Sequence, residues 1–360
     1  MKRRIIIIGS GIGGLACSCL LSKQGYEVDI FEKNKVIGGK AEKLLLPHTF
    51  SEAFHIFFTY LDLPLEKYIN LKPIDLPHSN NPFLNPYRFS YIYNNYDSPW
   101  DLFKPHVAYR VLREVLFPKK NSTAYVADTL VPSLITLAKK YGVLIRTNTA
   151  VAHIRIAQEQ VVGITTEEGR QYDADIVISN VDYQYTETDL LSIQDRQYSP
   201  SFWSTRRYSP SGYVLHMQCN EAIESIPEAS MIQTNKGNVV YINRQEKKLV
   251  VVMPVPLGVI YKGQQQLSIR REIIQSIEHN YAITNLKKHV IRSQSMTGKD
   301  IMQLYNSYKG NIAGLRPTFF QSGLWQLNND SRKVDYLYFV NSSDSLISPL
   351  LVCNSIKTIT

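Results

Sequence analysis

The stretch that most constrains the fold is IIIIGSGIGGLACSCLLSKQGYEVDIFEK, which fills residues 5–33. Ile5–Ile8 are apolar and β-branched, as expected of a central parallel strand that is buried on both faces. The G-x-G-x-x-G spacing follows at Gly9, Gly11 and Gly14. The first glycine permits a tight turn, the second lets a pyrophosphate approach the backbone, and the third lets a helix pack closely on the strand. Because strand, glycines and helix occur in this order, the stretch predicts a dinucleotide-binding turn.

A second strand is expected at residues 28–31, and Glu32 follows it at about the distance where a carboxylate bonds a ribose hydroxyl. An acid at this position disfavours a 2′-phosphate, which argues against NADP. Gly38, Gly39 and Lys40 then add a glycine pair and a base. This addition resembles the extended motif of FAD-binding flavoproteins of the amine oxidase and phytoene desaturase type. Lys40 can supply charge there but not the bidentate fork of an arginine, and the alternative is a solvated surface lysine.

Composition narrows the class of protein. A chain of 360 residues predicts two or three structural units. The net charge of +9 favours anionic surfaces, yet no nucleic-acid motif occurs, so no nucleic-acid partner is expected. The four cysteines lack metal spacing and predict neither a metal site nor a disulfide framework, which fits a reducing compartment. No apolar run reaches the roughly 18 residues that span a bilayer, and MKRRIIII fits a first strand better than a signal peptide.

The fold class expected is α/β. A Rossmann-like FAD-binding domain with a parallel sheet is joined to a smaller α+β substrate domain with a mixed sheet. Helices are predicted from about Thr49 and over 106–117, 124–141 and 268–281, with Pro132 as a possible kink. Strands are predicted within 143–178, with Ile176–Ile178 returning to the nucleotide-binding sheet, and at 213–219, 249–259 and 336–340. The expected division is a FAD-binding domain at 1–75, 124–185 and 301–360, a substrate- or membrane-facing segment at 76–123, and a substrate domain at 186–300.

Taken together, these segments resemble the bacterial carotenoid desaturase and isomerase family, of the phytoene desaturase type. The similarity lies in the opening residues, in GVLIRTNTAVAHI, DADIVISNVD and LVVVMPVPLG, and in residues 305–340. It implies FAD as the cofactor, with the backbone at Val151 meeting the adenine. The cofactor-binding residues that it implies are Gly9, Gly11, Ile12, Gly13, Gly14, Glu32, Lys33, Gly39, Lys40, Val151 and Asn180. In this family the cofactor carries the difficult chemistry, so no catalytic residue is assigned, and strand packing is expected for Tyr213 and His216.

The chain departs from the family pattern at three places. The glycine-containing segment that usually follows the glycine pair is absent after Leu44. The turn at 117–123 and the turn at 341–347 lack the family's glycines. Side chains there would crowd the flavin end of the cofactor, and the middle of the chain is also shorter than usual. The departures leave the adenosine half of the site intact.

Three functions therefore compete. The first is an FAD-dependent oxidoreductase that desaturates or isomerises a carotenoid-type polyene such as phytoene by hydride transfer to flavin. The second is a degenerate, non-catalytic relative that retains a nucleotide-binding core, and the third is an amine-oxidase-like flavoenzyme. Late residues such as GLRPTFFQSGLW favour the carotenoid branch over amine oxidation, and the oligomeric state stays open.

A membrane surface is the expected partner beside the hydrophobic polyene. The expected location is cytoplasmic and peripheral, at the inner face of the membrane. The segment 83–117 combines aromatic side chains, which settle at the headgroup boundary, with bases that are attracted to anionic lipid. These residues are Phe83, Tyr87, Phe89, Tyr91, Tyr93, Trp100, Phe103, Lys104, Arg110 and Arg113. The alternative is that the aromatic side chains simply pack the second domain.

Overall fold

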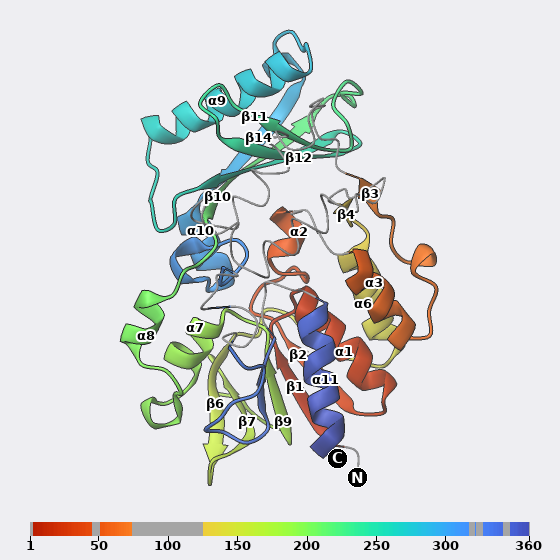
Figure 1. The fold of residues 1–360 in the computed structure, drawn as a ribbon, viewed down its shortest axis with the longest axis vertical. Helices are drawn as coiled ribbons and strands as arrows, with labels where there is room; N and C mark the ends of the chain where they lie inside the picture. The colour runs from red at the N-terminus through yellow and green to blue at the C-terminus, as the bar shows by residue number, and fades with distance from the viewer. Residues whose placement is uncertain are drawn as a thin grey trace, which may run out of the picture.

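The chain forms two regions that lie one above the other in Figure 1. The structure is a computed structural model, and it describes residues 3–44, 51–73, 125–316, 321, 327–340 and 346–359. The lower region contains both ends of the chain and is built around a parallel sheet. The upper region is built around an antiparallel sheet that one long helix covers.

The parallel sheet has the strand order β15-β9-β1-β2-β5. Its strands are β1 (Arg4–Ile8), β2 (Glu27–Phe31), β5 (Leu144–Arg146), β9 (Ile176–Ser179) and β15 (Leu337–Phe339). β1 lies at the centre, where Ile7 is opposite Ile30 of β2 and Ile178 of β9. The predicted return of Ile176–Ile178 to this sheet is confirmed, and so is the α/β fold class with its Rossmann-like domain.

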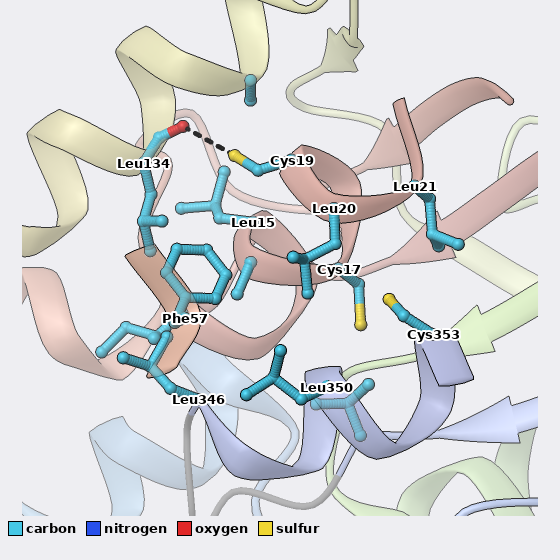
Figure 2. Close-up of a cluster of buried hydrophobic side chains, with 14 of the residues drawn as sticks. Leu15, Cys17, Cys19, Leu20, Leu21, Phe57, Leu134, Leu346, Leu350 and Cys353 are labelled. Atoms are coloured by element: carbon cyan, nitrogen blue, oxygen red, sulfur yellow. Dashed lines mark hydrogen bonds between the residues drawn. The ribbon is translucent and has the colours of Figure 1, made fainter. Parts of the chain in front are cut away.

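Helix α1 (Ile12–Lys23) packs between three other helices, which are α3 (Ser51–Tyr60), α6 (Leu130–Lys140) and α11 (Ile347–Ile359) (Figure 2). The helix is buried from Ile12 to Leu21, so burial is wider than one apolar face. Cys17 and Cys19 point in different directions, as expected, and both are buried and free. Burial raises the pKa of both thiols, and Cys17 lies beside Cys353 of α11.

The lower region also contains a three-stranded antiparallel sheet (Figure 1). It consists of β6 (Val151–Ala157), β7 (Gln160–Thr166) and β8 (Gln171–Asp173). Short elements complete the described chain. They are α2 (Lys40–Leu44), η1 (Leu65–Lys67), β3 (Lys72–Pro73), β4 (Tyr125–Val126), α7 (Tyr183–Tyr185), η3 (Thr186–Leu190), η4 (Ile193–Asp195), α8 (Pro200–Thr205), η5 (Leu286–Lys288) and η6 (Tyr308–Gly310).

The upper sheet has the order β11-β12-β13-β10-β14. Its strands are β10 (Ser211–Cys219), β11 (Ala229–Gln233), β12 (Val239–Gln245), β13 (Lys248–Val255) and β14 (Val290–Met296). Every pairing in it is antiparallel, whereas a mixed sheet was expected, because short connections join β11, β12 and β13 as hairpins. Helix α9 (Gln264–Asn280) covers one face, and α10 (Gly298–Tyr305) leads back to the lower region.

Three element boundaries differ from the sequence prediction by four residues or more. The helix expected from Ala124 begins only at Leu130, because Tyr125 and Val126 pair with β3. Pro132 therefore lies in the first turn, where a missing backbone N–H costs no helical hydrogen bond, and does not kink the helix. β13 ends at Val255 rather than 259, and α9 begins at Gln264 rather than 268. The turn at 117–123, residues 106–117 and residues 341–345 lie outside the described residues, as does Thr49.

The described part of the chain lacks two features. None of its helices has both the length and the apolar character needed to cross a membrane. No cluster of histidine, cysteine and acidic side chains there could hold a metal ion. The divisions at 75, 123, 185 and 300 stay predictions, although the parallel sheet does draw its strands from three separate stretches of chain.

Candidate nucleotide-binding site

The glycine turn lies at the carboxyl end of β1. Gly9 has a φ of +94°, a conformation that L side chains rarely adopt. A Cβ atom on Gly14 would lie 2.2 Å from the carbonyl oxygen of Gly9, so the helix can pack this closely on the turn only without a side chain. Gly11 caps α1 with no side-chain hydrogen bond. The first amides of α1 thus face the turn, the arrangement that binds phosphate groups.

Asn180, just after β9, packs directly over the glycine turn. Its side-chain nitrogen would lie 2.8 Å from a Cβ on Gly11, and its side-chain oxygen 2.5 Å from one on Gly13. Its backbone N–H donates to the carbonyl of Ile8 at 2.8 Å. The predicted site residues Gly11, Gly13 and Asn180 are therefore brought together, and Ile12 lies between them as the first residue of α1.

Glu32 lies at the end of β2 and is only 4% exposed. Its Oε2 accepts hydrogen bonds from the backbone N–H of Ser10 at 2.9 Å and from the Ser10 hydroxyl at 2.6 Å. Its Oε1 accepts from the backbone N–H of Asn34 at 2.8 Å. A buried carboxylate needs such donors, since an unpaired buried charge is costly. These bonds hold Glu32 beside the glycine turn, and its contact with a ribose hydroxyl stays a prediction.

The second glycine turn packs against the first. The backbone N–H of Gly38 donates to the carbonyl of Ser10 at 3.1 Å, and Gly38 forms a parallel bridge with Gly11. Gly39 has a φ of +60°, and a Cβ atom there would lie 3.1 Å from the Cα of Gly11. A side chain at Gly39 would therefore press on the backbone of the first turn, whereas one at Gly11 would meet the side chain of Asn180.

Lys40 connects the second turn to the upper region. Its ammonium donates to Oδ1 of Asn311 at 3.3 Å, and Nδ2 of Asn311 donates to Oδ2 of Asp182 at 2.8 Å. Burial lowers the pKa of Lys40 to about 8, although the negative charge of Asp182 acts in the opposite direction. Lys40 is half-buried, and its ammonium is held by Asn311 close to the second glycine turn.

The remaining two predicted residues lie differently. The Lys33 ammonium donates to the carbonyl of Gln303 at 2.8 Å and to Oδ1 of Asn306 at 2.6 Å, at the end of α10. It thus points to the upper region rather than to the glycine turns. Val151 is buried at the start of β6, shortly after Thr149, whose N–H donates to the carbonyl of Glu32 at 2.8 Å.

Four polar residues of the site were not predicted from the sequence. They are Ser10, Asn34, Asp182 and Asn311, and they hold Glu32 and Lys40 through the bonds given above. Ser10 and Asp182 had a signal in the sequence, because each lies in a turn at the carboxyl end of a strand of the parallel sheet, where Rossmann-like proteins bind their ligands. Asn311 lies about 270 residues from Lys40 in sequence, so only the fold could bring it in.

The arrangement fits the adenosine and pyrophosphate half of FAD. The first glycine turn leads into the N-terminus of α1, the carboxylate of Glu32 is held beside it by Ser10 and Asn34, and Lys40 supplies a positive charge. The upper sheet starts beside this site, because Ser211 at the start of β10 pairs with Asn311. The assignments of individual residues to the cofactor stay predictions.

Comparisons with known proteins agree with this fold. Residues 7–69 match the family described as an NAD(P)-binding Rossmann-like domain. The chain is 20% identical to a carotenoid 3,4-desaturase of Haloarcula japonica over 94% of this chain and 93% of that protein. It is 22% identical to a 4,4'-diaponeurosporene oxygenase of Staphylococcus aureus, over 95% and 94%. The first of these alignments runs over 466 positions, so the relative has segments without a counterpart in this chain.

Solved structures share the fold at low sequence identity. Glycine oxidase of Bacillus cereus has a TM-score of 0.59 and 17% identity over 100% of this chain and 96% of that chain. A glycerol-3-phosphate dehydrogenase of Bacillus halodurans, solved in complex with FAD, has a TM-score of 0.52 and 12% identity over 99% and 64%. The resemblance to the carotenoid desaturase family that the sequence indicated is confirmed by the two curated relatives.

Proposed function

We propose that this chain, as a relative of carotenoid desaturases and oxygenases, is an FAD-dependent oxidoreductase that acts on a carotenoid-type polyene. The desaturation or isomerisation of a substrate such as phytoene is the specific form of the proposal. It is supported by the similarity to two carotenoid enzymes over nearly the whole chain. A structural neighbour that was solved with FAD supports the choice of cofactor.

The observation that carries the proposal is the buried Glu32 held beside the glycine turn. Its three hydrogen bonds, from the two Ser10 donors and from the Asn34 amide, hold a carboxylate beside the glycine turn that we propose to bind the pyrophosphate. A free ribose diol suits this carboxylate, whereas a 2′-phosphate would be repelled by it. FAD carries such a diol on its adenosine half, and NADP does not.

The chemistry divides between cofactor and protein. Bound FAD would accept a hydride from an activated C–H bond of the polyene, and a proton leaves the neighbouring carbon when a double bond forms. The protein holds the cofactor through the glycine turns, Glu32 and Lys40. It also sets the upper sheet, beginning at Ser211, next to that site. Binding, orientation and exclusion of water are therefore the tasks of this chain.

A non-catalytic relative is the second candidate, and one observation favours it. Both carboxylate oxygens of Glu32 already accept hydrogen bonds from the protein itself. The same bonds could stabilise the turn in a protein that uses its nucleotide-binding core only for stability or interaction. The two candidates differ in what happens to bound flavin when a polyene is supplied.

Anaerobic mixing tests the two candidates. The purified protein is loaded with FAD and mixed with phytoene in liposomes, and the flavin's visible absorption is followed while the carotenoids are separated by chromatography. A desaturase bleaches the flavin and yields a more unsaturated product, and an isomerase yields a geometric isomer without net bleaching. Flavin that stays oxidised, with phytoene unchanged, would favour the non-catalytic candidate. A Glu32→Ala variant serves as the control, since it should already have lost bound flavin before the polyene is added.

The proposed location is cytoplasmic and peripheral, at the inner face of the membrane. The substrate is a long hydrocarbon that resides in the bilayer, so the enzyme must reach a lipid surface. The support is the sequence of residues 83–117, with its aromatic and basic side chains, which lie outside the described residues. Liposome sedimentation tests this: binding to anionic vesicles should weaken as salt rises, and equal failure to bind neutral and anionic vesicles at low salt would refute it.

A further inference from the structure

The side chain of Asn311 is fully buried and uses both ends of its amide. Its Nδ2 donates to Oδ2 of Asp182 at 2.8 Å and to the carbonyl of Tyr308 at 3.1 Å. Its Oδ1 accepts from the backbone N–H of Gly314 at 2.6 Å and from the Lys40 ammonium at 3.3 Å. The two acceptors fix the place of the amide nitrogen, so the amide oxygen must face Lys40. The connection Lys40–Asn311–Asp182 is called the amide bridge.

Asp182 holds the amide nitrogen in this orientation. Its Oδ2 accepts from the backbone N–H of Tyr308 at 3.2 Å as well as from Asn311, and its Oδ1 accepts from the backbone N–H of Gln184 at 3.2 Å. A carboxylate can only accept, so each of these bonds is of the kind that it can make. Its negative charge also favours the protonated form of Lys40, against the effect of burial.

The amide bridge joins two segments that both border the first glycine turn. One is the second turn, since a Cβ atom on Gly39 would lie 3.1 Å from the Cα of Gly11. The other is the turn after β9, where Asp182 comes two residues after Asn180, whose side chain packs over Gly11. The ammonium of Lys40 is thus held between two neighbours of the N-terminus of α1, where anions are attracted.

The ammonium keeps donors for a ligand. A lysine has three N–H donors, and Asn311 is its one hydrogen-bond acceptor among the residues that the structure describes. Lysine binds phosphate groups as a point charge. A free lysine side chain loses rotamer freedom when it binds an anion, whereas the amide bridge restrains Lys40 beforehand. An anion at the glycine turns would therefore meet a cation that is already in place.

From these observations we infer that Asn311 and Asp182 are positioning residues, which hold the Lys40 ammonium within reach of the pyrophosphate of the dinucleotide. The inference rests on the proposed function for the identity of that dinucleotide, FAD. The two residues act on the cofactor only through Lys40, and no chemical step is assigned to them. Because Asn311 also pairs with Ser211, the first residue of β10, the amide bridge ties the start of the upper sheet to the cofactor site.

The amide bridge has a consequence for the pH dependence of FAD binding. Burial lowers the pKa of Lys40 to about 8. A pyrophosphate attracts the ammonium and not the neutral amine, so bound FAD favours the protonated form. The affinity for FAD should therefore fall as pH rises from about 7 to about 9.5, by at most about tenfold per pH unit because one proton is involved.

Other titratable groups near Lys40 must be separated from it. Asp182 is the charged group that acts on its pKa. The further ionisable side chains on the surrounding elements are Glu32, Lys33, Glu42, Lys43, His216 and Lys309. Burial raises the pKa of Tyr208 and Tyr305, which are influenced by these carboxylates, so both tyrosines stay neutral over this range. Burial also lowers the pKa of Lys33, so the assignment to Lys40 needs variants.

Titration of FAD into the full-length chain at several pH values, followed by flavin fluorescence, tests the inference. Asp182→Asn keeps the shape of the side chain and removes its charge. The pKa of Lys40 should then fall further, so the decline in FAD affinity should begin at lower pH than in the wild type. Asp189→Asn is the matched control, since Asp189 is exposed on η3, and it should keep the wild-type profile.

A double-mutant cycle shows whether Asn311 acts through Lys40. Asn311→Leu removes the acceptor and Lys40→Met removes the ammonium, and each should weaken FAD binding about tenfold at neutral pH. The double variant should bind FAD within about twofold of Lys40→Met alone, because the amide then has nothing to position. Lys40→Met should also lose the pH dependence, whereas Lys35→Met, at an exposed position, should keep both the affinity and the profile.

Three results would overturn the inference. They are a wild-type affinity that does not change with pH, a wild-type profile in Asp182→Asn, and additive losses of about a hundredfold in the double variant. If Asn311→Leu does not fold, the profile of Asp182→Asn decides. Any of these results in a protein that binds FAD removes this inference and leaves the proposed function standing. A wild-type protein that binds no FAD would overturn both.

Discussion

The glycine turn of the lower region and the middle of the upper sheet bury polar groups differently. In the lower region, the carboxylate of Glu32 is buried and accepts three hydrogen bonds from Ser10 and Asn34. In the upper region, His216 and Asn243 each bury a polar atom that finds no partner in the structure. The first arrangement is complete within the protein, and the second is not. The difference teaches that the glycine turn holds its buried carboxylate with donors from the chain itself, whereas the upper sheet leaves two polar atoms without a partner.

The largest loss of stability and of FAD binding is expected from a substitution where the glycine turn is most tightly packed. In Gly14→Ala, the new Cβ would meet the Gly9 carbonyl oxygen at 2.2 Å, a backbone atom that cannot move alone. We expect the free energy of unfolding to fall by about 3 kcal/mol or more, with loss of FAD binding. Chemical denaturation followed by circular dichroism measures the first effect, and equilibrium dialysis measures the second.

Gly25→Ala is the matched control for that variant. Gly25 has a φ of +98° but no atom within 4 Å of a new Cβ. It should lose only about 1–2 kcal/mol through backbone strain, and FAD affinity should not change. If the two variants were equally destabilised, close packing of the turn would not explain its glycines.

Removal of the Glu32 carboxylate should have the next largest effect. Glu32→Ala leaves the Ser10 and Asn34 amides without their acceptor and removes a charged hydrogen bond to a ribose hydroxyl. FAD binding should weaken by roughly 1.5–3 kcal/mol, measured by isothermal titration calorimetry. Glu27→Ala, at the exposed start of the same strand, is the control and should bind as the wild type does. An unchanged dissociation constant in Glu32→Ala would contradict the assignment.

The two regions also differ in how much the sequence could predict. Residues 5–33 predicted strand, turn, helix and acid correctly, because each signal is local and the buried strand is uniformly apolar. The bonds of the Lys33 ammonium to Gln303 and Asn306, about 270 residues away, could not be predicted, because no local pattern relates positions so far apart, and its role at the cofactor stays a prediction. The pairing of His216 and Asn243 with Val250 depends on strand register, and no local pattern specifies register.

Titration of Lys40 should make the free energy of unfolding depend on pH, and this effect is of intermediate size. Burial lowers its folded-state pKa to about 8, below the ordinary 10.5. Between these two values the unfolded chain binds more protons than the folded one, so this group makes the protein more stable as pH rises. The contribution is at most about 1.4 kcal/mol per pH unit.

Denaturation at several pH values measures how much Lys40 contributes to stability, when the wild type is compared with a variant that lacks the ammonium. Relative to the wild type, Lys40→Met should lose the rise in stability between about pH 8 and 10.5. Lys35→Met, at an exposed position nearby, should keep it. Parallel curves for wild type and Lys40→Met would show that the ammonium is solvated.

The smallest effect is expected at the two orphaned atoms. His216→Phe with Asn243→Val removes polar atoms that have no partner, so the free energy of unfolding should be unchanged or higher by up to about 1 kcal/mol. Ser230→Ala is the contrast within the same sheet, because the Ser230 hydroxyl is bonded to the hydroxyl of Tyr281 at 2.6 Å. That variant should lose about 1 kcal/mol. A large loss in the double variant would mean that the two atoms are satisfied by ordered water.

The central claim is that the glycine turns, Glu32 and Lys40 form a preorganised site for FAD. The visible absorption spectrum of the purified protein, recorded after incubation with FAD and removal of free cofactor by gel filtration, tests it most directly. The account predicts that flavin absorption elutes with the wild-type protein and with Gly25→Ala, and is lost or much reduced in Gly14→Ala and Glu32→Ala. A folded wild-type protein that elutes without flavin, at FAD concentrations that saturate other flavoproteins, would contradict it.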